Sequence, residues 1–359
     1  MKSFSVTSLR KEYTVSFQSG LGFLDDLKKT GAVWIIDRNV HLLYQKQFAD
    51  IDAGSVVLID ASEGRKTLAG AEDIYRQLIA RQMKRHMVIV SVGGGITQDV
   101  SGFVASTFYR GTRWTYIPTT LLAQGDSCIG SKTSLNLDSS KNLLGTFYPP
   151  DEVFISTAFL GSLSPKEFFS GYGEIVKLQL MQARHEADLQ FIRDRLARGK
   201  SHPDALLELI YDSLFIKKTY IEEDEFDYGR RRLLNYGHCF GHALESASKF
   251  NIPHGLAVVV GMLFANTIAL KRDRISSKIF DFTAHSIFLP HLHPDLFVMQ
   301  EDYFDADVIA QNMMRDKKRS GTGLSLVLPG TNLELEIIQD VTPEEVAYGC
   351  GELKKMINA

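Results

Sequence analysis

Two histidines of this sequence, His238 and His242, are four residues apart, so on a helix they would lie one turn apart on one face. A third histidine, His254, follows them, and Glu174 lies upstream. Imidazole and carboxylate groups suit a divalent ion such as zinc, and three protein ligands with an open fourth position are typical of a catalytic metal site. The sequence therefore predicts such a site, with its ligands drawn from these four residues.

Three consecutive glycines, Gly93–Gly95, follow an apolar run and precede a helix-like segment. Glycines at that place let backbone amides approach a pyrophosphate at the positive end of a helix. Their order is not GxGxxG, and a tight turn explains the run alone equally well. Asp37, after an earlier apolar run, and the pair Glu63 and Lys66 could bind ribose hydroxyls and phosphate, although each alone is also a common type of surface charge.

The composition is that of an ordinary globular protein. A chain of 359 residues exceeds the usual single core, which favours two domains sharing a cleft. The net charge of -3 gives no electrostatic footprint for nucleic acid or an acidic membrane. The 3 cysteines are an odd number without CxxC spacing, and no apolar run reaches the length of a membrane span, so we expect a cytoplasmic protein.

The expected fold is an α/β domain with a parallel sheet over residues 1–156, followed by a mostly α-helical domain over residues 157–359. Apolar runs predict buried strands at 32–36, 55–59, 87–92 and 114–117, with a helix at 71–81. Apolar residues recur at helical spacing over 168–180, 205–220, 233–248, 256–270 and 305–314. Late segments predict a small hairpin from 324–328 and 333–338 and a closing helix at 343–357.

Ordered motifs along most of the chain resemble those of 3-dehydroquinate synthase and the wider sugar phosphate cyclase superfamily. They run from about Asp37 to the Asp316-Lys317-Lys318 segment and include Gly93-Gly-Gly-Ile-Thr-Gln-Asp99, Ile117-Pro-Thr-Thr, Gly173-Glu174-Ile-Val-Lys177 and Asn235-Tyr-Gly-His238-Cys-Phe-Gly-His242. The resemblance implies an NAD-binding α/β domain and a helical domain that holds a divalent metal, usually zinc, or another such as cobalt. It also implies an active site between the domains, commonly in a homodimer.

The resemblance also assigns roles to individual residues. It makes Glu174, His238 and His254 the metal ligands, and it places His242 near the phosphate, assisting proton transfer. The implied substrate contacts are Arg110, Asp126, Lys132, Asn142, Lys177, Lys217, Arg231, Asn235 and one of Lys317 and Lys318, for which Lys318 is preferred. The implied NAD contacts are Asp37, Asn39, Glu63, Lys66, Gly94, Gly95, Asp99, Thr119, Thr120, Lys141, Phe159, Ser162 and Glu167. Arg110 is expected to reach the phosphate from the partner subunit.

In the reaction that the resemblance implies, NAD oxidises a substrate alcohol, phosphate leaves by β-elimination, NADH returns its hydride, and an intramolecular aldol step closes a carbocycle. The lysine and arginine side chains then suit a phosphorylated sugar acid. Lys132, Lys177 and Arg231 could bind the carboxylate, which favours a heptulosonate phosphate as substrate.

The sequence also departs from the family pattern. It has Gln98 where glycine is usual, Gly125 where a larger residue is common, Ser131 where glycine is usual before lysine, and Leu256 in place of a glutamate; residues 60–66 differ too. These departures leave open another sugar phosphate, as in enzymes that make 2-epi-5-epi-valiolone or 2-deoxy-scyllo-inosose. An NAD-dependent polyol dehydrogenase and a cofactor-binding protein without catalysis are further alternatives, and the retained set of lysines and metal ligands disfavours both.

Overall fold

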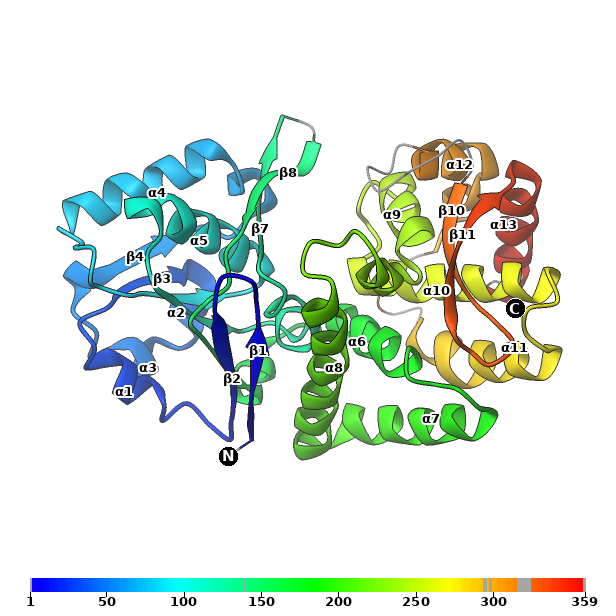
Figure 1. Ribbon diagram of the computed structural model, residues 1–359, viewed down its shortest axis with the longest axis horizontal. Coiled ribbons are helices and arrows are strands. Elements are labelled where there is room, and N and C mark those ends of the chain that lie inside the picture. The colour runs from blue at the N-terminus through cyan, green and yellow to red at the C-terminus, as the bar shows by residue number, and fades with distance from the viewer. Residues whose placement is uncertain (1, 139, 293–295, 297–298, 315–323, 358–359) are drawn as a thin grey trace. The chain divides into compact units, whose positions relative to one another are not determined.

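The chain folds into two compact units, shown in Figure 1. Unit 1 consists of residues Met1–Leu163 and Lys218–Phe226, and unit 2 of Ser164–Lys217 and Asp227–Ala359. The structure is a computed structural model that describes all residues except 1, 139, 293–295, 297–298, 315–323 and 358–359. Unit 1 thus runs past the expected boundary at residue 156 and includes nine residues from the middle of the helical half.

The described part of unit 1 is built on a seven-stranded sheet, with the strand order β1-β2-β9-β6-β5-β3-β4. All neighbouring pairs are parallel except β1 with β2. The strands are β1 (Ser3–Thr7), β2 (Glu12–Gln18), β3 (Val33–Asp37), β4 (Val56–Ile59), β5 (Ile89–Gly93), β6 (Trp114–Pro118) and β9 (Glu152–Ser156). A separate antiparallel hairpin is formed by β7 (Lys132–Leu137) and β8 (Ser140–Phe147).

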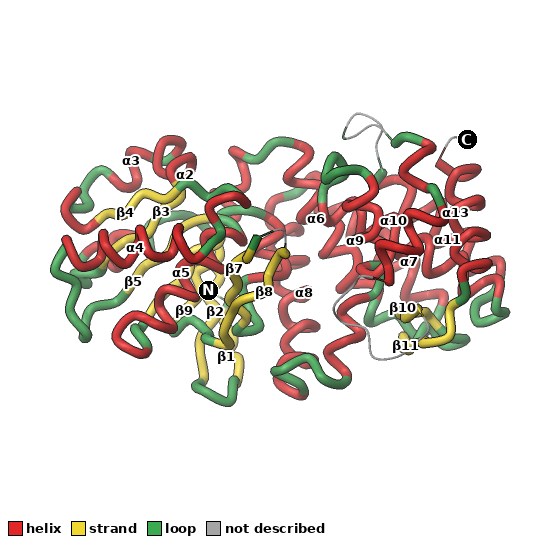
Figure 2. The backbone as a smooth tube through the Cα atoms, turned by 90° about the horizontal axis from the view of Figure 1, so that it is seen from above, coloured by secondary structure: helices red, strands yellow, loops and turns green. Residues whose placement is uncertain are grey.

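The central strands are apolar at almost every position because both faces of the sheet are covered. Trp34 and Ile36 point to one face, into a core that also contains Val92 and Phe159, whereas Ile35 points to the other face and is also fully buried. Figure 2 shows the strands with helices on either side. The helices of unit 1 are α1 (Leu24–Lys28), α2 (Arg38–Leu43), α3 (Gln45–Phe48), α4 (Leu68–Ala80) and α5 (Gly95–Thr107).

The sequence analysis found the four strands that are apolar throughout and missed β1, β2, β7, β8 and β9. The strand β8 shows the reason, since most of its residues are exposed or half-buried and it has no apolar run. The strand β2 alternates polar and apolar residues, as expected when one face of a strand is more open than the other. The parallel sheet itself is confirmed, with an antiparallel strand β1 at its edge.

Unit 2 is mostly helical in its described part. Its helices are α6 (Pro165–Leu180), α7 (Glu186–Ser201), α8 (Pro203–Glu223, whose last turns belong to unit 1), α9 (His238–Ala247), α10 (His254–Lys271), α11 (Ser277–Thr283), α12 (Ala306–Met314) and α13 (Pro343–Ile357). The predicted hairpin is confirmed as β10 (Leu324–Pro329) paired with β11 (Leu335–Val341). The helix expected over 233–248 instead begins at His238, because Gly237 has a φ of 79° that stops an α-helix there.

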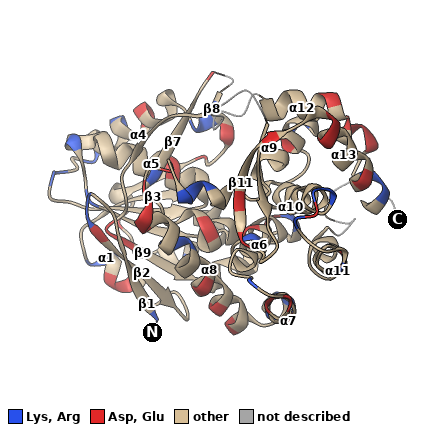
Figure 3. Cartoon of the chain, turned by 45° about the vertical axis from the view of Figure 1, so that its right-hand side comes forward, with Lys and Arg blue, Asp and Glu red and all other residues tan. Residues whose placement is uncertain are grey.

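The helix α10 is the core of unit 2. It packs against α6, α9 and α13, and almost every residue from Gly255 to Ala269 is buried. Among the described helices it is long and apolar enough to span a membrane, but 83% of its apolar window is buried inside the protein. Its apolar character is therefore explained by core packing. Figure 3 shows acidic and basic residues interspersed over the elements of both units, in keeping with the net charge of -3.

Candidate active site

The carboxylate of Glu174 lies at the centre of a cluster of ionisable groups in unit 2. Its Oε1 atom is 3.3 Å from His238 Nε2 and 3.0 Å from His254 Nε2, and its Oε2 atom is 2.5 Å from Lys177 Nζ. Glu174 and Lys177 are almost completely buried, whereas the side chain of His254 is 31% exposed. The structure thus brings together Glu174, His238 and His254, as expected from the sequence.

Glycines allow the three helices to approach closely enough for this convergence. A Cβ atom added to Gly173 would lie 2.2 Å from the carbonyl oxygen of Gly255, so α6 and α10 touch through their backbones next to Glu174 and His254. A Cβ atom on Gly261 would lie 1.9 Å from the carbonyl oxygen of Gly237, which brings α9 against α10 next to His238. The positions of the three side chains therefore depend on backbone contacts that exclude even a methyl group.

A methyl group at the α6–α10 contact is expected to disrupt the site from outside it. In Gly255→Ala, the new Cβ would lie 1.7 Å from the carbonyl oxygen of Ser170, so α10 must move away from α6. We expect a loss of about 2–3 kcal/mol in the free energy of unfolding and at least a tenfold weaker affinity for zinc. Urea unfolding and zinc titration measure the two effects. Gly351→Ala, on α13 with open space around it, is the control. Unchanged zinc affinity in Gly255→Ala would contradict this account.

Outer hydrogen bonds fix the orientation of both imidazole rings. His238 Nδ1 is 3.3 Å from the carbonyl oxygen of Tyr236, and His254 Nδ1 is 3.2 Å from Glu245 Oε2. These acceptors place the proton on Nδ1 and leave Nε2 as a ligand atom facing Glu174, an arrangement that is typical of histidines that bind metal ions. The sequence analysis missed Glu245. Its signal was present, since Glu245 lies seven residues after His238, about two turns along α9.

The spacing of the ligand atoms can be compared with that of a zinc site. Two ligand atoms about 2.1 Å from zinc at a tetrahedral angle lie about 3.4 Å apart. The distances of 3.3 Å and 3.0 Å from Glu174 Oε1 to the two Nε2 atoms are close to that value. One carboxylate oxygen and two imidazole nitrogens on three separate helices thus fit a divalent ion with small adjustments.

The ionisation of the cluster reflects burial and the surrounding charges. Burial alone raises the pKa of Glu174, but the Lys177 ammonium and His238 outweigh it and hold this pKa well below its usual value. Burial and the charge of Lys177 lower the pKa of His238 to about 4. For His254, burial lowers the pKa, but hydrogen bonds to Glu174 and Glu245 outweigh burial and raise it to about 10. Without a metal ion, His254 therefore carries the proton that balances Glu174.

His242 lies beside the same cluster. The ligand atoms of His238, His242 and His254 are all within 4.8 Å of one another, and the His242 and His254 rings are stacked with centroids 5.7 Å apart. His242 is half-buried and projects from α9 one turn after His238. It is therefore available to act on a ligand bound at the cluster.

The glycine run of unit 1 lies at the edge of the sheet where the parallel strands end. Gly93 ends β5, and Gly94 is the N-cap of the 13-residue helix α5. A Cβ atom on Gly94 would lie 3.0 Å from the methyl group of Thr120, and the Thr119 amide donates to the carbonyl oxygen of Gly93, 3.0 Å away. Gly94 and Gly95 therefore place no side chain at the N-terminus of α5, as the close approach of a pyrophosphate would require.

A polar network joins residues that the sequence analysis assigned to two different ligands. Lys66 Nζ donates to Asp99 Oδ2 and to Asn142 Oδ1, each at 2.6 Å. Glu63 joins this network through Asn136, because the Nδ2 atom of Asn136 donates to the Glu63 carboxylate at 2.8 Å. Burial raises the pKa of Asp99, and the nearby Lys66 ammonium opposes that rise. The expected NAD contacts Glu63, Lys66 and Asp99 and the expected substrate contact Asn142 thus lie together.

The other expected NAD contacts have distinct surroundings. Asp37 caps α2 by accepting from the Asn39 amide at 2.8 Å. The hydroxyl of Tyr44, which the sequence analysis did not consider, donates to the carbonyl oxygen of Phe159 at 2.9 Å and to Ser162 Oγ at 3.0 Å. The Phe159 side chain is fully buried, so only its backbone could contact a ligand. The list is completed by Lys141, exposed on β8, and by Glu167, exposed in unit 2, where it caps α6 through Ser164.

The remaining expected substrate contacts fall on both units. Arg110 has a φ of 62° in a strained turn after α5, and Lys132 is exposed at the start of β7. In unit 2, Lys217 and Arg231 are 7% and 5% exposed. Asp126 lies in a turn over Ala123–Ser127, Asn235 donates to the carbonyl oxygen of Arg232, and Lys317 and Lys318 lie outside the described residues.

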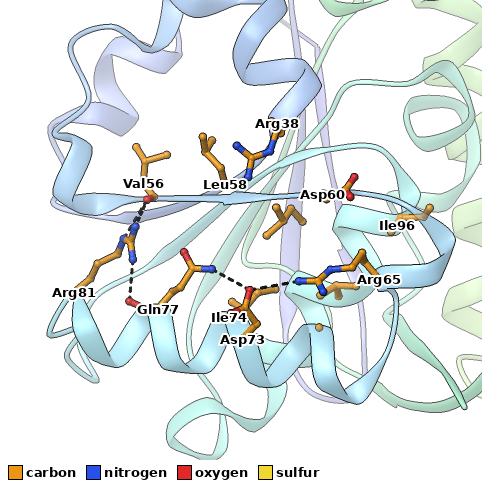
Figure 4. Close-up of a pocket in the computed structure, with 13 residues that line it drawn as sticks. Arg38, Val56, Leu58, Asp60, Arg65, Asp73, Ile74, Gln77, Arg81 and Ile96 are labelled. Atoms are coloured by element: carbon orange, nitrogen blue, oxygen red, sulfur yellow. Dashed lines mark hydrogen bonds and ion pairs between the residues drawn. The ribbon is translucent and has the colours of Figure 1, made fainter.

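A cavity of about 370 Å³ lies elsewhere in unit 1, between β4, α4 and the start of α5 (Figure 4). Its lining includes Leu58, Ile74 and three arginines, but none of the expected site residues. Two of those arginines are engaged, because Arg81 donates to the carbonyl oxygen of Val56 and Arg65 lies 3.6 Å from Asp73. Its lining includes no residue of the ionisable cluster or of the glycine run.

Comparisons with known proteins agree with these features. Residues 56–170 match the 3-dehydroquinate synthase N-terminal family, and residues 171–319 match its C-terminal family. The 3-dehydroquinate synthase of Streptococcus equi subsp. equi is 32% identical over 92% of both chains. That of Rhodopseudomonas palustris is 36% identical over 87% of this chain and 84% of its own.

A solved structure also resembles this one along nearly its whole length. It is ValA, the 2-epi-5-epi-valiolone synthase of Streptomyces hygroscopicus subsp. jinggangensis 5008, with NAD+ and Zn2+ bound. The TM-score is 0.83, with 26% identity over 98% of this chain and 99% of ValA. The fold is therefore that of the sugar phosphate cyclases. Together with the matches along the sequence, this means that the chain belongs to the 3-dehydroquinate synthase family.

Proposed function

We propose that this protein is a 3-dehydroquinate synthase-like sugar phosphate cyclase, a phosphate-eliminating lyase that uses NAD and a divalent metal, with zinc as the first choice. The observation that carries the proposal is the convergence of Glu174, His238 and His254 beside the buried Lys177, in a member of that family. The preferred substrate is a heptulosonate phosphate. We further propose a cytoplasmic homodimer that serves aromatic amino acid biosynthesis through the shikimate pathway.

The residues of the cluster would divide the work. Glu174, His238 and His254 would hold the metal, and Glu245 would keep His254 oriented through its Nδ1 atom. When bound, the metal would polarise a substrate oxygen, and NAD would accept and return a hydride. Lys177 would place its ammonium next to that oxygen. Its positive charge would stabilise negative charge that develops on the oxygen, although Lys177 would not bind the metal itself.

Cationic side chains would bind the acidic parts of the substrate. The family pattern assigns the carboxylate to Lys132, Lys177 and Arg231, and the phosphate to Arg110, with His242 close to the leaving group. Fixed ammonium and guanidinium groups favour an anionic substrate and hold it in one orientation. His242 would move or hold the proton near the phosphate oxygen, because it is half-buried beside the ligand atoms.

The glycine run and the Lys66 network would bind NAD. Backbone amides at Gly94 and Gly95 would meet the pyrophosphate at the start of α5, while Asp37 and Asn39 would bind a ribose. Asp99 would contact the nicotinamide carboxamide, and Lys66 holds its carboxylate in place through a bond of 2.6 Å.

Phosphate release across a panel of C7 and C6 sugar phosphates, with NAD and zinc present, tests the proposal. We expect release from a heptulosonate phosphate without net accumulation of NADH, because the hydride is returned within one turnover. Net NADH formed from a simple polyol would instead indicate a dehydrogenase. Failure of every C7 and C6 sugar phosphate, with both cofactors bound, would reject the cyclase.

A second candidate substrate is the sugar phosphate used by 2-epi-5-epi-valiolone synthases. The structural similarity to ValA, which extends over 98% of this chain, favours it. The departures from the family pattern, such as Ser131 before Lys132, point the same way. A substrate without a carboxylate would not need Lys132, Lys177 and Arg231 as a set. Preference for a heptulose phosphate that lacks a carboxylate in the same panel would therefore select this alternative.

Zinc uptake is expected to release a proton. The pKa of His254 is about 10 in the metal-free protein, so its Nε2 atom is protonated near neutral pH, and a ligand must be deprotonated. The proton and the metal compete, so the apparent zinc affinity should rise about tenfold per pH unit between about pH 7 and pH 9. Calorimetry in two buffers with different ionisation enthalpies measures the release. Uptake without proton release would show that His254 is not a ligand.

A further inference from the structure

A short segment from the middle of the helical half is built into unit 1. The helix α8 (Pro203–Glu223) passes out of unit 2 after Lys217, and residues Lys218–Phe226 belong to unit 1. There, Glu222 accepts a hydrogen bond of 2.7 Å from the Thr7 amide, at the end of β1. The segment is therefore bonded to the N-terminal hairpin of unit 1.

Glu225, in the same segment, accepts three hydrogen bonds from distant parts of unit 1. Its Oε1 atom accepts from Ser8 Oγ at 2.6 Å and from Ser131 Oγ at 2.8 Å, and its Oε2 atom accepts from the Leu9 amide at 2.7 Å. The side chain is buried, with 8% of its surface exposed. One carboxylate thus joins three parts of the chain that are far apart in sequence.

The conformation of Ser131 explains why its hydrogen bond to Glu225, here called the tether, is needed. Ser131 has a φ of 65°, in the left-handed region that favours glycine, and glycine is the usual residue here in the resembling family. The Cβ of Ser131 makes this conformation costly, and the hydroxyl that it carries supplies the bond to Glu225. Ser131 in addition accepts from the Tyr148 amide at 2.7 Å, so its backbone is held on both sides.

Phe226, the residue after Glu225, contacts strand β8 of the β7–β8 hairpin. Its ring meets Phe147 edge-to-face, with centroids 4.9 Å apart and an interplanar angle of 87°. Phe147 is the cross-strand partner of Lys132 in the β7–β8 hairpin. Glu225 therefore bonds the residue before Lys132, and Phe226 contacts the residue that pairs with Lys132 on the opposite strand.

We propose that Glu225 and Phe226 form a clamp that orients Lys132, which makes Glu225 a positioning residue for substrate binding. This inference rests on the proposed function for the role of Lys132. The clamp lies in a stretch of chain that Lys217 directly precedes and Arg231 shortly follows. The segment that contains the clamp is thus close in sequence to Lys217 and Arg231, and its clamp acts on Lys132, so it is connected to three of the proposed substrate-binding cations.

Glu225→Gln tests the clamp, with Glu222→Gln as the matched control. A glutamine keeps the shape of the side chain and removes its charge, so the contacts with the Leu9 amide and the two hydroxyls lose their charge assistance whichever way the amide is turned. Glu222 instead bonds the Thr7 amide at the end of β1, so its loss tests the same segment at a different contact. We expect KM for the sugar phosphate to rise about tenfold in Glu225→Gln, with NAD affinity and zinc content unchanged, and no rise in the control.

A pair of substitutions at Ser131 separates the tether from backbone strain. Ser131→Gly removes the hydroxyl and the strain together, whereas Ser131→Ala removes the hydroxyl and keeps the Cβ at a φ of 65°. Both are expected to raise KM, and only Ser131→Ala is expected to lower the melting temperature. Wild-type KM in folded Glu225→Gln and in Ser131→Gly would overturn the proposal.

Hydrogen exchange distinguishes a failed clamp from a failed function. In Glu225→Gln, and not in Glu222→Gln, amides of residues 131–148 should exchange about tenfold faster, because the base of the hairpin opens more often. If the wild-type protein released no phosphate from any substrate while this exchange difference appeared, the proposed function would fail and the clamp would stand. Equal exchange in both variants would reject the clamp whatever the activity.

Discussion

Replacing His238 with alanine is expected to abolish zinc binding and to lower phosphate release by at least about a thousandfold. His238 supplies one of the Nε2 atoms that face Glu174 Oε1, and its ring is fixed by the carbonyl oxygen of Tyr236. Its loss leaves two ligands, and these cannot hold zinc against the proton that His254 carries at neutral pH. Metal analysis of the purified protein and a phosphate-release assay measure the two effects.

The control for this prediction is His285→Ala, an exposed histidine of unit 2 that lies outside the cluster. It should retain one zinc per chain and full activity. The His238→Ala protein should keep its fold, because His238 is the first residue of α9 and alanine is compatible with a helix at that position. Circular dichroism checks this point. A folded variant that retains its zinc would remove His238 from the ligand set and with it the basis of the proposed site.

The central strands were predictable because their signal is local. Segments such as Val33–Asp37 are apolar at successive positions, since helices cover both faces of the sheet, and any sequence window detects such a run. The hairpin of β7 and β8 gives no comparable run, because most of β8 is exposed. The base of this hairpin also contacts residues much further along the chain, since Ser131 bonds Glu225 and Phe147 meets Phe226.

The residues of the candidate site were also predictable where their signal is local, and the contacts that bring them together were not. The spacing of His238 and His242 on one helix is a local pattern, and the family motifs supplied Glu174 and His254. The backbone contact of Gly173 with Gly255 that brings these ligands together joins two helices far apart in sequence. The link of Asn142 to Lys66 is also non-local. Such contacts become visible only in three dimensions, since no spacing in the sequence encodes them.

Two departures from the family pattern gain a physical reason from the structure. Gln98 exchanges two hydrogen bonds with Ser127, donating to its carbonyl oxygen at 2.7 Å and accepting from its hydroxyl at 2.8 Å. Ser131 is held by Glu225 in a conformation that favours glycine. In both cases a polar side chain that is unusual at its position has a partner elsewhere in unit 1. These two departures therefore concern how loops are held, and neither residue is a proposed metal ligand.

Lys177 and His238 have opposite relations to the metal although both touch Glu174. The ammonium of Lys177 is 2.5 Å from Oε2, whereas His238 approaches Oε1. A cation beside a ligand carboxylate stabilises that carboxylate in the metal-free protein and repels a bound metal ion. Removal of Lys177 should therefore lower the stability of the metal-free protein while leaving the three proposed metal ligands in place.

Lys177→Met is accordingly expected to lower phosphate release by about a hundredfold to a thousandfold and to keep one zinc per chain, bound at least as tightly as in the wild type. In the metal-free state, loss of the partner of a buried carboxylate should cost up to about 3–5 kcal/mol of unfolding free energy, and zinc should restore much of it. Lys166→Met, exposed on the same helix α6, is the control. Urea unfolding with EDTA or with zinc measures the difference. If Lys177→Met lost its zinc as His238→Ala does, Lys177 would be a structural support of the metal site, and its proposed role beside the substrate oxygen would be wrong.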